Sequence, residues 1–127
     1  MVRPTFLMAE IEPPEGLSAR KLVLETGKFN VITAYSEQEA IELFKAFPGI
    51  TALILHPAIC QEQCSNTIKK IKQAKPEMPV IILTPQENSK FPGADHQISS
   101  HEPQELLNLV RSLFGDPRPP DQKKRRT

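Results

Sequence analysis

Short, almost wholly apolar segments that alternate with helix-patterned segments are the strongest constraint on how this chain can fold. Strands apolar on both faces are typical of a parallel sheet that is buried between two layers of helices. Their alternation with helices indicates right-handed β-α-β crossovers. A chain of 127 residues is long enough for one such domain. The strands are expected over Thr5–Ala9, Phe29–Ala34, Ile50–Leu55, Pro79–Leu83 and, more weakly, His96–Ser99.

Amphipathic helices are predicted between and after these strands. Ser36 and Glu39 form a capping-box pattern that marks the start of one of them. Residues 85–93 are mostly polar and contain two prolines, which leaves room only for a shortened fourth helix. This order of elements predicts an α/β domain of the flavodoxin-like, doubly wound type with a five-stranded parallel sheet. The other helices are expected over residues 17–27, 36–47, 61–75 and 102–114.

The domain is expected to cover residues 3–114, followed by a disordered basic tail over residues 115–127. Five of the 16 basic residues lie beyond Gly115, but only two of the 15 acidic ones do. The folded part is therefore slightly acidic, which argues against a nucleic-acid-binding domain. The basic run Lys123–Arg126 is read as a solvated terminus, with binding to nucleic acid or anionic lipid as the alternative. No apolar stretch is long enough to suggest a signal peptide or a membrane span.

Polar side chains follow several of the predicted strands, at the edge where open parallel sheets bind their ligands. Glu10 and Glu12 follow the first strand, His56 the third, Thr84 the fourth and Ser100 the fifth. The chain has five glycines but no Gly-x-Gly turn. Binding of a nucleotide or dinucleotide is therefore not expected.

Several segments, in this order and at these intervals, resemble the receiver domain of bacterial response regulators, and the resemblance spans about residues 3–114. Receivers accept a phosphoryl group on an aspartate at the end of strand three, and two acids after strand one help to bind Mg²⁺ there. A Ser or Thr after strand four and a Lys after strand five contact the phosphoryl group. The resemblance rests on the segments 3–8 with 12–13, 35–44, 52–55, 79–84 and 93–95.

Carried over to this chain, most of the family's site is absent. Glu10 stands at the first acidic position, but Ile11 takes the second and His56 replaces the acceptor aspartate. Thr84 is retained, and Ser100 falls where the lysine belongs. Before Asp116 the chain holds one aspartate, Asp95, which precedes strand five and so lies away from this edge. Glu10 and Glu12 would hold a magnesium ion weakly or not at all.

We therefore expect a cytoplasmic, non-catalytic pseudo-receiver that has no bound cofactor and acts as a protein-interaction module. The resemblance implies that its partner is a histidine kinase or another response regulator. Three other readings stay open: phosphoryl transfer to His56, a Glu10–Glu12 acid–base pair, and a metal or redox site at His56, Cys60 and Cys64, with Glu10 as a further ligand. Cys64 shares the inward stripe of the predicted helix, so it is read more simply as a buried thiol in a reducing compartment.

Overall fold

The computed structural model describes residues 3–12, 18–84, 93–99 and 102–117. Ser100, the predicted helix stub apart from Gly93, and most of the predicted tail lie outside these residues. Five parallel strands form one sheet in the order β2-β1-β3-β4-β5. The flavodoxin-like prediction is thus confirmed. The strands are β1 (Thr5–Ala9), β2 (Asn30–Ala34), β3 (Ala52–Leu55), β4 (Val80–Thr84) and β5 (His96–Ser99).

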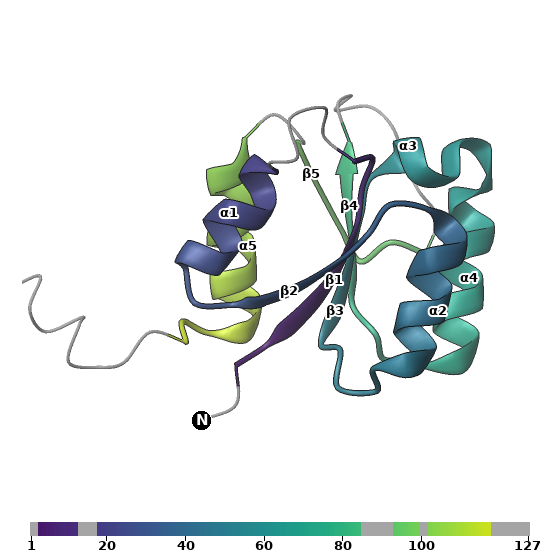
Figure 1. Ribbon diagram of the computed structural model, residues 1–127, viewed down its shortest axis with the longest axis horizontal. Helices are drawn as coiled ribbons and strands as arrows, with labels where there is room; N and C mark the ends of the chain where they lie inside the picture. The colour runs from purple at the N-terminus through teal and green to yellow at the C-terminus, as the bar shows by residue number, and fades with distance from the viewer. Residues whose placement is uncertain (1–2, 13–17, 85–92, 100–101, 118–127) are drawn as a thin grey trace, which may run out of the picture.

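Helices cover both faces of the sheet (Figure 1), with α1 and α5 on one face and α2, α3 and α4 on the other. No helix in the described ranges is both long and apolar enough to cross a membrane. The helices are α1 (Ala19–Thr26), α2 (Glu37–Ala46), α3 (Pro57–Cys60), α4 (Cys64–Ala74) and α5 (Pro103–Phe114), with a 3₁₀ turn, η1 (Gln61–Gln63), between α3 and α4.

Side chains alternate along each strand between two apolar cores. On β1, Phe6 and Met8 pack toward α1 and α5, whereas Leu7 and Ala9 pack toward α2 and α4. α1 and α5 approach closely at Gly27, where a Cβ atom would lie 2.7 Å from Cδ1 of the Leu107 side chain, so that side chain would have to shift. The all-apolar strands are therefore explained by burial on both faces of the sheet.

The helix after β3 differs from the prediction, which placed it over residues 61–75. It begins four residues earlier, at Pro57, because the fixed φ of proline suits a first helical position. It then breaks at Gln61, whose φ of 49° is incompatible with a right-handed helix. The first half of the predicted capping box is confirmed, since the Ser36 hydroxyl accepts from the Glu39 N–H, but the Glu39 carboxylate accepts from the Tyr35 N–H, one residue before the cap.

Candidate functional site

The carboxyl ends of β1, β3 and β4 bring three of the predicted site residues to one edge of the sheet. Glu10 directly follows β1, His56 directly follows β3, and Thr84 ends β4. Two backbone hydrogen bonds fix this register: the Glu10 N–H donates to Ala34 O at 3.0 Å, and the His56 N–H donates to Ala9 O at 2.8 Å. Together with Arg20, described next, these residues form what we call the carboxyl-edge site.

Glu10 is buried, with 1% of its surface exposed, and it is held by Arg20 from the first turn of α1. Two nitrogens of the Arg20 guanidinium donate to the same carboxylate oxygen of Glu10, Nη2 at 2.8 Å and Nε at 3.2 Å. The second oxygen, Oε2, has no hydrogen-bond partner within the described part of the chain. A buried carboxylate needs a compensating charge, and here the guanidinium supplies it.

Arg20 decides how well the site suits the magnesium ion that the receiver fold implies. Mg²⁺ in such sites is held by carboxylates, and Glu10 is the one carboxylate buried at this edge among the residues that the structure describes. Its charge is already matched by Arg20, so a divalent cation would meet a positive group instead of an acidic cluster. The residues present therefore do not fit a receiver-type magnesium site.

His56 caps α3 in place of the aspartate that a receiver carries at this position. Its Nδ1 accepts a hydrogen bond from the Ala58 N–H at 3.1 Å, which assigns the ring proton of the neutral form to Nε2. Burial lowers the pKa of His56, and the positive charge of Arg20 lowers it further, while the negative charge of Glu10 opposes them. A neutral capping imidazole is thus the favoured form near pH 7.

The remaining predicted site residues divide between buried and exposed positions. Thr84 is buried, as its place at the end of a central strand requires. Ile11 is 58% exposed, and Glu12 is exposed as well, so Glu12 does not join Glu10 in the site. An acid–base pair of Glu10 and Glu12, one of the readings that the sequence left open, is therefore not supported, because Glu12 lies past the end of β1, where the chain leaves the sheet. Ser100 lies outside the described residues.

Cys60 and Cys64 form a disulfide, so the prediction of a free buried thiol at Cys64 is wrong. The two Cα atoms lie 4.8 Å apart, within the range that a disulfide bridges, and the backbone break at Gln61 falls between them. The paired sulfurs offer no thiolate to a metal, and no group of three metal-ligating side chains occurs in the described ranges. A metal centre at His56, Cys60 and Cys64 is therefore not supported.

Asp95 is confirmed to lie away from the carboxyl-edge site. Its carboxylate accepts hydrogen bonds from Lys72 Nζ at 2.7 Å and from the Val80 N–H at 2.8 Å, at the opposite end of β4 from Thr84. Burial alone would raise the pKa of Asp95, but these two hydrogen bonds and the charge of Lys72 outweigh it and lower the pKa. Asp95 therefore serves as a structural anchor between α4 and β4.

Arg20 is the site residue that sequence reasoning missed. The helical spacing over residues 17–27 identified the inward stripe of α1 and left Arg20 without a role. The usable signal was its position in the first turn of the helix that follows β1, since that turn lies near the strand's carboxyl end in a β-α-β unit.

Comparisons with known proteins support the fold through solved structures. No family model and no curated protein matches the sequence. A receiver domain from Clostridium thermocellum has 22% identity and a TM-score of 0.74, covering 98% of this chain and 99% of its own. A response regulator from Thermotoga maritima has 26% identity and a TM-score of 0.74, covering 89% and 98%. A chemotaxis response regulator of Vibrio cholerae has 14% identity and a TM-score of 0.76, covering 89% and 100%. The chain has the fold of a response-regulator receiver domain.

Proposed function

We propose that this protein is a signalling module of the receiver fold that takes up no phosphoryl group and acts by binding another signalling protein. The observation that carries the proposal is the ion pair between Arg20 and Glu10 at the carboxyl edge of the sheet. In this reading, the Arg20 guanidinium permanently takes the place beside the buried acid that Mg²⁺ would take in a receiver, and the pair leaves no free positive charge. The site would then keep one state, with no phosphorylation step to change it.

The chemistry at His56 supports the same conclusion. Attack on a phosphodonor needs a nucleophile together with positive charge that stabilises the transferring oxygens. The Nδ1 atom of His56 is already engaged by the Ala58 N–H, and Glu10 neutralises the nearby guanidinium of Arg20. A carboxylate acceptor is absent from the described part of this edge, apart from Glu10, which Arg20 occupies. We therefore assign no catalytic residue and no enzymatic activity.

A partner within a phosphorelay is part of the proposal, and the receiver fold supports it. Receiver domains act by binding other signalling proteins, so a histidine kinase or a second response regulator is the expected class of partner. A cytoplasmic location belongs to the same proposal, since it would place the protein beside such partners.

Exposure to acetyl phosphate with Mg²⁺, followed by intact-mass measurement, tests the proposed function. We expect no phosphoryl adduct on the natural sequence. An adduct that disappears in His56→Ala would refute the proposal and establish His56 as an acceptor. The matched gain-of-function variant combines Ile11→Asp, Arg20→Ala and His56→Asp. If this variant gains a phosphoryl adduct, the natural residues at these three positions are what prevents phosphorylation.

A further inference from the structure

The helical face opposite α1 and α5 carries an apolar groove between α2 and α4. Two adjoining cavities of about 220 and about 150 Å³ share Phe44, Lys45 and Ala74, so they form one continuous depression, which we call the α2–α4 groove. Its larger part lies near Pro48 and Met78, just before β3 and β4 begin. That is the opposite end of the sheet from Glu10 and His56.

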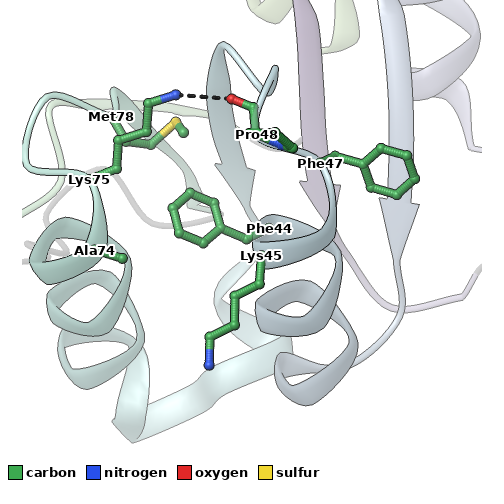
Figure 2. Close-up of a pocket in the computed structure, with 7 residues that line it drawn as sticks. All are labelled: Phe44, Lys45, Phe47, Pro48, Ala74, Lys75 and Met78. Carbon is green, nitrogen blue, oxygen red and sulfur yellow. Dashed lines mark hydrogen bonds between the residues drawn. The ribbon is translucent and has the colours of Figure 1, made fainter.

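The floor of the groove is apolar. Figure 2 shows the Phe44 ring extending from α2 toward Ala74 and Met78. Met78 is buried and belongs to the core beneath, so the floor is firmly packed. Phe47, at the end of α2, points away from Phe44 and is 47% exposed, which extends the apolar surface past the rim. A large apolar side chain of another molecule could therefore make apolar contacts with this floor.

The rim of the groove is positively charged. Lys45 has no carboxylate partner among the described residues, and Lys75 Nζ donates only to the backbone carbonyls of Pro48 and Ile50, each at 3.4 Å. Lys70 pairs with Glu37 at 3.5 Å, and both side chains are partly exposed. The helix α4 itself contains three lysines and no acidic residue. Within the described part of the chain, two lysine charges thus flank the apolar floor without a neutralising carboxylate.

We propose that the α2–α4 groove docks a segment of a partner protein in which one apolar side chain is flanked by carboxylates. A volume of about 220 Å³ is below the usual size of a site for a small-molecule ligand, but a single anchoring side chain fits it. The unpaired lysines favour acidic neighbours beside that anchor. The inference deepens the proposed interaction role and rests on it.

Selection of short random peptides from a displayed library, on the whole 127-residue chain, tests the groove. We expect enrichment of peptides that carry Leu or Phe next to Asp or Glu. Their affinity should fall at least about tenfold in the double variant Lys45→Glu with Lys75→Glu, and also with rising salt. Ala74→Phe, on the exposed side of α4, fills the groove without changing charge and should weaken binding equally. Lys69→Glu, which leaves the groove intact, is the matched control.

Failure to enrich acidic peptides with an apolar anchor would overturn the docking proposal, and so would equal binding to the groove variants and to Lys69→Glu. Concentration-dependent self-association that Ala74→Phe abolishes would overturn it too, by assigning the groove to a second copy of this chain. Thermal melting of each variant establishes that the fold is intact. Phosphorylation is measured separately, by mass. The proposed function and the docking proposal can therefore fail independently of each other.

Discussion

The Arg20 guanidinium lies 2.8 Å from the Glu10 carboxylate, so the acid at the end of β1 meets an arginine from its own domain. Glu10 is buried and Arg20 is partly so, with 23% of its side chain exposed. Both members of such an ion pair are needed, because a buried charge without its partner destabilises the folded state. The same pair therefore supports the fold locally. It also leaves the carboxyl edge with two opposite charges that are already matched.

Arg20→Ala should lower the free energy of unfolding by about 3 kcal/mol, since it leaves the Glu10 carboxylate buried without its counter-charge. Urea unfolding followed by circular dichroism measures the loss. Adding Glu10→Gln to the same chain removes the orphaned charge and should recover part of the stability. A loss in Arg20→Ala no larger than that of an exposed ion pair, below about 1 kcal/mol, would contradict the importance of this contact.

His56 should titrate below its ordinary value of 6.5 in NMR spectra of the folded protein. Arg20→Ala should raise this pKa by removing a nearby positive charge, and Glu10→Gln should lower it further. The unfolded chain takes up the proton more readily than the folded one. The stability that depends on neutral His56 is therefore complete above pH 6.5 and declines as the pH falls from 6.5 through the lowered folded-state pKa. A midpoint above 6.5 would show that the ring is not held in this environment.

Asp95→Asn should reduce stability by about 1 kcal/mol or less at neutral pH, because the anchor to Lys72 and the Val80 N–H is partly exposed. The lowered pKa of Asp95 means that its contribution is present above pH 3.8 and is lost as the pH falls through the folded-state value. The two proteins should therefore converge in stability in acid. A difference that stays constant with pH would rule out the carboxylate charge as the cause.

Cys60 and Cys64 should resist alkylation in denaturant until a reductant is added, since both sulfurs are in the disulfide. Intact-mass measurement then counts two alkyl groups after reduction and none before it. Cys60→Ser is the control, because the remaining thiol should react without reductant. Disulfides are uncommon in a reducing cytoplasm. Alkylation of both cysteines in freshly lysed cells, without added reductant, would mean that the disulfide is reduced inside the cell.

The architecture could be predicted from the sequence because burial on both faces leaves a clear pattern. The segments Ala52–Leu55 and Val80–Thr84 are almost wholly apolar, and their alternation with helix-patterned segments is typical of central parallel strands. The placing of Glu10, His56 and Thr84 at one edge followed from the rule that parallel strands end together. These inferences depend on local composition alone.

Features that depend on side-chain contacts between elements could not be predicted in the same way. The pairing of Arg20 with Glu10 depends on how α1 is rotated over β1, which the helical spacing left undetermined. The disulfide joins residues on either side of a backbone break at Gln61, where the residue type gives no signal for a positive φ. The sequence left the place of Glu12 open, because β1 ends at Ala9 and the alternation of side chains does not continue to it.

A titration with Mg²⁺ and beryllofluoride, monitored by backbone amide NMR shifts, tests the central claim most directly. Beryllofluoride with Mg²⁺ mimics a phosphoryl group in a site that supplies an acceptor carboxylate and a metal. The account predicts no saturable shift at the amides of Glu10, His56 and Thr84, because Arg20 already matches the buried charge. Saturable shifts at these three amides, with a bound fluorine signal, would contradict it.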